Sequence, residues 1–255
     1  MKRNIIIFQL FLLLVGCHNG NVQYVDFADL SMADSVTFRV TAQKTTNLQE
    51  LSEDPEMLAL WGMVDTTATP VANEAGVRGP QRATSTSVAG IMQELLDFSK
   101  SKIAIELSGL YPSIDVDGQP TILSGKVILP AEGPIKRYIL VSHYTIASNK
   151  EAPSNIFSLE GLLVKLGYAL IIPDYIGYGV TADKVHPYLV MELTARNVLD
   201  MYNAVVPFLK KAGCAPEYDD IYLMGYSQGG ATTMAVQHEI EHHDYPIKLR
   251  RVFAG

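Results

Sequence analysis

The chain has 255 residues, of which 48% are hydrophobic and 18% charged. This length and composition suit one large α/β domain with a substantial buried core, and two full domains would be a tight fit. The formal net charge is -7 and no segment is polybasic, so nucleic acid is not an expected partner.

The N-terminal segment combines a basic start, an apolar run from Ile5 to Val15 broken only by Gln9, and small residues before Cys17. The run is too short to span a bilayer comfortably and is typical of a secretory signal peptide. Its end, LVGC, resembles the bacterial lipobox, which implies a lipidated Cys17 as the mature N-terminus. An ordinary secretory leader with an incidental cysteine is the alternative.

A lipidated cysteine carries several acyl chains, and these hold a protein stably at a membrane. We therefore expect an exported protein anchored in the bacterial cell envelope, at the outer membrane or the cell surface, with the membrane as a partner through that anchor. Only Cys214 would then remain as a free thiol, so no intrachain disulfide is expected.

The region between the leader and residue 101 carries few structural signals. Residues 18–35 are polar with scattered apolar positions and predict a tether. Residues 36–101 are interpreted as an N-terminal extension, mostly irregular over 41–85 because Thr, Ala, Pro and Gly dominate there. The extension holds one weak strand pattern and two helical patterns, at Val36–Val40, Glu50–Trp61 and 88–100.

From Lys102 onward, strand and helix patterns alternate. Six apolar runs predict strands, at Ile103–Leu107, Gly125–Leu129, Arg137–His143, 168–175, Asp220–Met224 and Lys248–Phe253. Asp117-Gly118 is the expected hairpin turn between the first two. Four leucines from Leu159 to Leu166, capped by Gly167, and the apolar residues from Val198 to Leu209 keep helical spacing. The alternation predicts the α/β class, with a mostly parallel sheet and helices on both faces.

Gly225 to Gly229 reads GYSQG, a G-x-S-x-G string that is weak by itself because Gly and Ser are common. Its context is stronger. A nucleophile elbow needs a buried strand, a tight turn with small residues around the serine, and then a helix. The run IYLM supplies the strand, and a helical pattern begins at Gly230. Ser227 is therefore the candidate nucleophile, and the amide of Gln228 is a candidate oxyanion donor.

His238 to His242 reads HEIEH, the spacing of zinc peptidases in which two histidines bind the metal and the glutamate activates water. Glu241 adds a charge where such enzymes usually have none, and Tyr245 and Lys248 stand where the metzincin extension needs Gly and His. We interpret these histidines as the exposed end of a helix, where they interact favourably with its dipole. No metal or other cofactor is expected, and zinc catalysis stays the less favoured alternative.

Three segments resemble the α/β-hydrolases, and among them the secretory-lipase group of esterases: SGKVILP (124–130), GYALIIPDYIGYG (167–179) and GYSQGG (225–230). The similarity covers Lys102 to Gly255. It implies a partial α/β-hydrolase fold with esterase or lipase activity, through an acyl-enzyme formed at Ser227 on a small-molecule or lipid ester. The second oxyanion donor of this fold follows the strand RYILVSH, which implies the amide of Tyr144 or Thr145.

Three other polar residues lie near these motifs in the sequence. The resemblance implies that His143 is a structural or oxyanion-loop histidine and not the catalytic base. Asp174 is expected to organise the turn that follows its strand. His186 is interpreted as an exposed loop histidine, with a place at the entrance to the site as the alternative.

Enzymes of this fold keep the chain order Ser, then Asp or Glu, then His. The residues after Ser227 form a helix and one further strand, and no acidic residue or histidine among them is placed to partner the serine. We therefore expect the N-terminal portion of a longer hydrolase, which lacks the last strands and the triad Asp and His and is inactive alone. A non-catalytic lipoprotein that keeps the fold as a scaffold is the alternative.

Overall fold

The computed structural model describes residues 37–47 and 103–255. The leader with Cys17, the tether over 18–35 and the two helical patterns at Glu50–Trp61 and 88–100 lie outside the described residues. Within the described residues, no helix is both long and apolar enough to cross a membrane.

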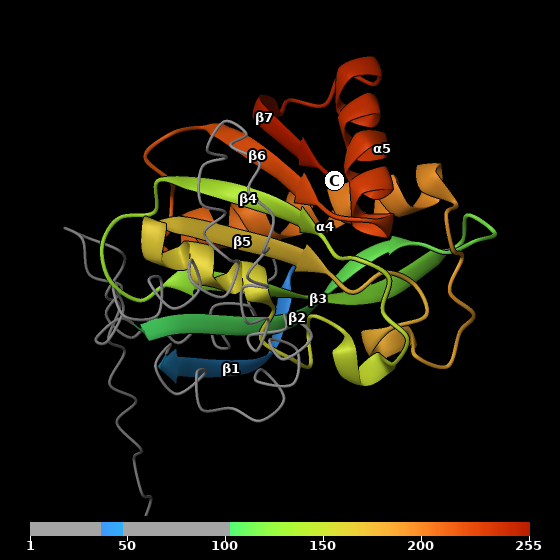
Figure 1. The fold of residues 1–255 in the computed structure, drawn as a ribbon, viewed down its shortest axis with the longest axis horizontal. Helices are drawn as coiled ribbons and strands as arrows, with labels where there is room; N and C mark the ends of the chain where they lie inside the picture. The colour runs from blue at the N-terminus through green and yellow to red at the C-terminus, as the bar shows by residue number, and fades with distance from the viewer. Residues whose placement is uncertain (1–36, 48–102) are drawn as a thin grey trace, which may run out of the picture.

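A seven-stranded sheet with the order β1-β2-β3-β5-β4-β6-β7 forms the centre of the fold (Figure 1). Its strands are β1 (Arg39–Asn47), β2 (Ile103–Ile114), β3 (Pro120–Pro130), β4 (Arg137–Ser142), β5 (Tyr168–Pro173), β6 (Asp220–Gly225) and β7 (Lys248–Ala254). Strands β5, β4, β6 and β7 are parallel, whereas β1, β2 and β3 are antiparallel to their neighbours. The predicted α/β class is confirmed.

Helices cover both faces of the sheet. The α-helices α4 (Met191–Lys211) and α5 (Gln228–His242) pack on one face, and the 3-10 helix η3 (Leu159–Leu166) packs on the other. Successive residues of β4 alternate between these two cores: Leu140 packs with the α4 and α5 side, and Val141 packs with the η3 side. A strand buried on both faces needs an apolar residue at nearly every position, which explains the continuous run in this strand.

The hairpin between β2 and β3 turns where the sequence predicts. Gly118 has a left-handed φ of 71°. The Asp115 carboxylate accepts hydrogen bonds from the backbone N–H groups of Asp117, at 3.0 Å, and Gln119, at 2.9 Å. An aspartate that bonds the backbone two residues ahead stabilises such a turn locally.

The N-terminal extension departs from expectation. Residues 41–47, predicted to be irregular, form most of β1, which pairs with β2 and so joins the sheet. Phe38 just before β1 is fully buried, with its ring 5.4 Å from that of Phe208 on α4. Pairing with β2 and burial of this aromatic ring organise a segment whose local composition carries little strand signal.

The leucine stripe before β5 forms a helix, but as the 3-10 helix η3. Gly167 caps it in the left-handed conformation, with φ 85°. A 3-10 helix has three residues per turn, so the face that meets the sheet differs from that of an α-helix. Of the four leucines, Leu162 is buried whereas Leu166 is 42% exposed.

Candidate functional site

Ser227 lies between the end of β6 and the start of α5, at an exposed point of the sheet's carboxyl edge. Its backbone has φ 57° and ψ -120°, a region that non-glycine residues rarely occupy. The Ser227 N–H donates to the carbonyl of Gly255 at 2.7 Å, and its own carbonyl accepts from Ala231 at 3.1 Å. The serine therefore sits on a sharp, strained strand-to-helix turn, as a nucleophile elbow requires.

Glycine is required at three positions of this turn, because backbone atoms of other residues come too close for a Cβ atom. A Cβ on Gly225 would meet the carbonyl of Gly229, and one on Gly229 would meet the carbonyls of Ser142 and His143. A Cβ on Gly230 would meet the carbonyl of Gly255. All of these contacts would be shorter than 3.0 Å, so GYSQGG admits no larger residue at its glycine positions without movement of the backbone.

The two candidate oxyanion donors follow the ends of two neighbouring strands, β4 and β6. Ser142 of β4 pairs in register with Gly225 of β6, so Tyr144 and Ser227 each stand two residues beyond a paired position. Tyr144 is half-buried, whereas the alternative Thr145 is exposed. Gln228 is 2% exposed and opens α5, where a helix start leaves N–H groups without intrahelical acceptors. The fold thus brings both candidates to the edge that carries Ser227.

His143 is a buried structural histidine. Its Nδ1 lies 2.7 Å from the carbonyl oxygen of Tyr144, and its Nε2 lies 3.0 Å from that of Asp174. Burial lowers the pKa of its imidazole below the ordinary 6.5, so the ring is neutral at neutral pH and donates to one of the two carbonyls. Among the described residues, no hydrogen bond joins it to the Ser227 hydroxyl.

Asp174 organises the turn after β5, as the sequence predicts. It is fully buried, and its Oδ2 accepts from the Ser124 hydroxyl at 2.6 Å while its Oδ1 accepts from the Ser154 N–H at 2.8 Å. The Ser124 oxygen in turn accepts from the Val180 N–H at 2.9 Å. Asp174 thereby joins β3 to the loop after β5.

His186 was expected to be an exposed loop residue, and this prediction is wrong. It is half-buried, with its Nδ1 2.7 Å from the carbonyl oxygen of Ile176 and its Nε2 2.6 Å from Nε2 of Gln228. Sequence reasoning missed this contact because the partners stand 42 residues apart and belong to no common motif.

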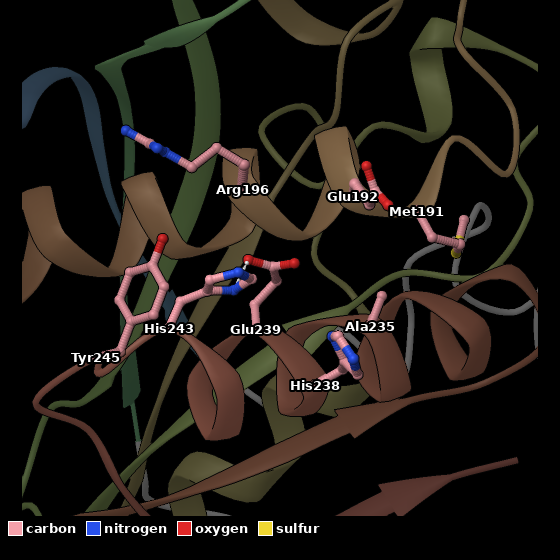
Figure 2. A pocket seen from close by; sticks show the side chains of 8 residues that line it. All are labelled: Met191, Glu192, Arg196, Ala235, His238, Glu239, His243 and Tyr245. Carbon is pink, nitrogen blue, oxygen red and sulfur yellow. Dashed lines mark ion pairs between the residues drawn. The ribbon is translucent and has the colours of Figure 1, made fainter.

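The HEIEH segment forms the last turns of α5, along a groove between α5 and α4 (Figure 2). The exposed rings of His238 and His242 stack on each other at 4.1 Å, and His242 donates to the His238 carbonyl at 2.9 Å. Within the described part of the chain, no three His, Cys, Asp or Glu side chains are grouped to hold a metal. His238 also lies about 16 Å along the helix from Ser227, so the two motifs do not form one site.

Neither a protein-family model nor a curated protein sequence matches this chain. Among solved structures, it is similar to a protein from Legionella pneumophila described as a hydrolase, with 26% identity and a TM-score of 0.54 over 60% of this chain and 42% of the other. It is also similar to the rice cell wall degrading esterase LipA from Xanthomonas oryzae, with 27% identity and a TM-score of 0.54 over 64% of this chain and 45% of the other.

The chain thus spans less than half the length of either neighbour. Their similarity agrees with the architecture described above. The chain has the fold of the α/β-hydrolase class, which it shares with a hydrolase and an esterase of known structure.

Proposed function

We propose that this protein is a serine hydrolase of the esterase or lipase type, with Ser227 as its nucleophile. One observation carries the proposal. Ser227 adopts a backbone conformation with positive φ at the junction of β6 and α5, and three glycines around it are required by steric contact. A non-glycine residue held in such a conformation costs free energy, and proteins keep it mainly where function depends on it.

In the proposed reaction, the Ser227 hydroxyl attacks the carbonyl carbon of an ester and displaces the alcohol, which leaves with a proton. Water then hydrolyses the acyl-enzyme to the acid and free Ser227. The amides of Gln228 and Tyr144 would stabilise the negative charge on the tetrahedral oxygen in each step. The similarity to an esterase of known structure supports an ester as the substrate class.

The mechanism needs an acid and a base, because an unassisted serine hydroxyl is a poor nucleophile at neutral pH. Among the described residues, no histidine hydrogen-bonds the Ser227 hydroxyl; His143 and His186 are both held by other partners. We propose that polypeptide following β7 supplies both groups, in the order acid then histidine that this fold keeps. The activity is thus that of the whole protein, which we place at the cell envelope through a lipid on Cys17.

The test is hydrolysis of a short-chain aryl ester, p-nitrophenyl butyrate, by the full-length protein. Ser227→Ala should lower kcat/KM by about 10³-fold or more, because the covalent step is lost. A fluorophosphonate probe should label the wild type and leave the Ser227→Ala variant unlabelled.

Ser108→Ala is the matched control. Ser108 lies on β2, and its hydroxyl donates to the carbonyl of Ser154 at 2.8 Å, away from the elbow. This variant should keep its turnover and its labelling. Unchanged turnover in Ser227→Ala would rule the proposal out.

A further inference from the structure

A turn after β5 faces two histidines, each of which contacts a residue proposed as an oxyanion donor. Two histidines face its backbone: Nε2 of His143 lies 3.0 Å from the carbonyl oxygen of Asp174, and Nδ1 of His186 lies 2.7 Å from that of Ile176. The Tyr175 ring lies between the imidazoles, 4.0 Å from His143 and 6.2 Å from His186, and is nearly parallel to the latter at 9°. His143 adjoins Tyr144, and His186 reaches Gln228. The turn therefore connects the two sides of the proposed oxyanion hole.

The contacts of His186 select one tautomer. The Ile176 carbonyl can only accept, so Nδ1 must carry the proton and donate to it. In a neutral ring Nε2 is then unprotonated and accepts from Nε2–H of Gln228, at 2.6 Å. His186 thus connects the backbone of the turn to the side chain of the residue that follows Ser227.

The Gln228 side chain depends on this contact. It is 2% exposed, and its Oε1 has no hydrogen-bond partner among the described residues, so its Nε2 provides its polar anchor. The backbone N–H of the same residue is the proposed oxyanion donor. Holding the side chain therefore restrains the first residue of α5, which a helix start otherwise leaves without intrahelical bonds at its N–H.

We propose that His186 is a positioning residue of the oxyanion hole, which acts through the Gln228 side chain to fix the Gln228 amide. This inference rests on the proposed function of Ser227 and adds a residue to it. The groups that face His186 are the rings of Tyr175, Tyr178 and Tyr188, with centroids 5.0 to 6.2 Å away. None of these three side chains is a carboxylate.

The first part of the test does not depend on activity. Long-range ¹H–¹⁵N NMR of the full-length protein, with the signals of His186 assigned by their loss in His186→Phe, should show protonated Nδ1 and unprotonated Nε2. In Gln228→Glu the new carboxylate favours a proton on Nε2, so both nitrogens should be protonated at neutral pH. An Nε2–H tautomer in the wild type would overturn the inference.

The second part measures turnover of p-nitrophenyl butyrate. His186→Phe keeps the ring stacking and loses both hydrogen bonds, and it should lower kcat on the order of 10- to 100-fold while KM changes little. Gln228→Met should have a similar effect, and the double variant should lose no more than either single one, because both remove the same contact. Gln228→Met also serves as the second variant if His186→Phe fails to fold.

His242→Phe is the control. This exposed histidine lies at the end of α5, and its hydrogen bond goes to the His238 carbonyl in the same helix. Its kcat should match the wild type. Additive losses in the double variant, or unchanged kcat in both single variants, would overturn the inference while the activity of Ser227 stands. A wild type without turnover would instead overturn the proposed function and with it the positioning role, and the NMR result would still report the contact.

Discussion

At the scale of single residues, backbone strain occurs in two turns of the proposed site. Four non-glycine residues among those described have positive φ, and two of them, Tyr175 and Ser227, belong to the turns around the proposed oxyanion hole. Each is held by its surroundings: Tyr175 is 1% exposed and stacks on His143, and the Ser227 N–H is bonded to the Gly255 carbonyl. Such conformations persist because neighbouring contacts outweigh their cost.

This strain predicts an effect on stability that is independent of activity. Ser227→Gly should have a free energy of unfolding about 1 kcal/mol higher than Ser227→Ala, because glycine adopts positive φ without a Cβ clash. Urea denaturation followed by circular dichroism measures the difference. At Ser108, in the middle of strand β2, the same pair should show the opposite order, since glycine weakens a strand. Equal stabilities of the two Ser227 variants would contradict a strained elbow.

At the scale of elements, one buried ion pair connects the antiparallel strands. The Lys126 ammonium on β3 lies 2.5 Å from the Glu106 carboxylate on β2, and both side chains are at most 5% exposed. The hydroxyl of Thr46 on β1 donates to the same carboxylate, and Lys126 also donates to the Ile156 carbonyl at 2.7 Å. Burial lowers the pKa of Lys126, although Glu106 opposes that shift. The pair therefore connects β1, β2 and β3 to one another and to the loop that contains Ile156.

Removal of one partner should destabilise the protein strongly. Lys126→Met leaves a buried carboxylate without its cation, and the free energy of unfolding should fall by about 3–5 kcal/mol. The double variant Glu106→Leu/Lys126→Met removes both charges and should recover most of that loss. Urea denaturation of the two single variants and the double variant forms the cycle. Losses that simply add would show that the two side chains are not energetically coupled.

At the scale of the whole molecule, the proposed membrane anchor and the site lie in different parts of the chain. Cys17 precedes the described residues, whereas Ser227 stands at the carboxyl edge of β6 within the sheet. The net charge of -7 gives the protein no electrostatic attraction to anionic lipid surfaces. Membrane association should therefore depend on the lipid at Cys17.

Cys17→Ser in the full-length protein should move it from the membrane fraction to the soluble fraction of cells, because it removes the thiol that would be acylated. Fractionation followed by immunoblotting measures this shift. Cys214→Ala is the control: this thiol is buried, so its loss should leave the protein with the membranes. Retention of Cys17→Ser at the membrane would contradict the lipid anchor.

Local sequence patterns were enough to predict much of the fold and the central residue of the proposed site, Ser227. The continuous apolar run of β4, the Asp117-Gly118 turn and the strand-turn-helix context of Ser227 each depend on residues close together in the sequence. Their periodicity and turn chemistry therefore predict them. The leucine stripe before Gly167 likewise predicts a helix, but three-residue and four-residue spacing overlap in so short a segment, and the 3-10 form exposes Leu166.

By itself, the sequence determined the α/β class, the strands of the parallel half and the position of Ser227 at the elbow, because short-range spacing encodes all three. Only the tertiary structure decided that residues 41–47 complete the sheet as β1, and that His186 binds Gln228. Both depend on contacts between segments far apart in the chain. Such contacts form when burial of surfaces such as Phe38 against Phe208 stabilises them, and no local pattern encodes which distant partner will be met.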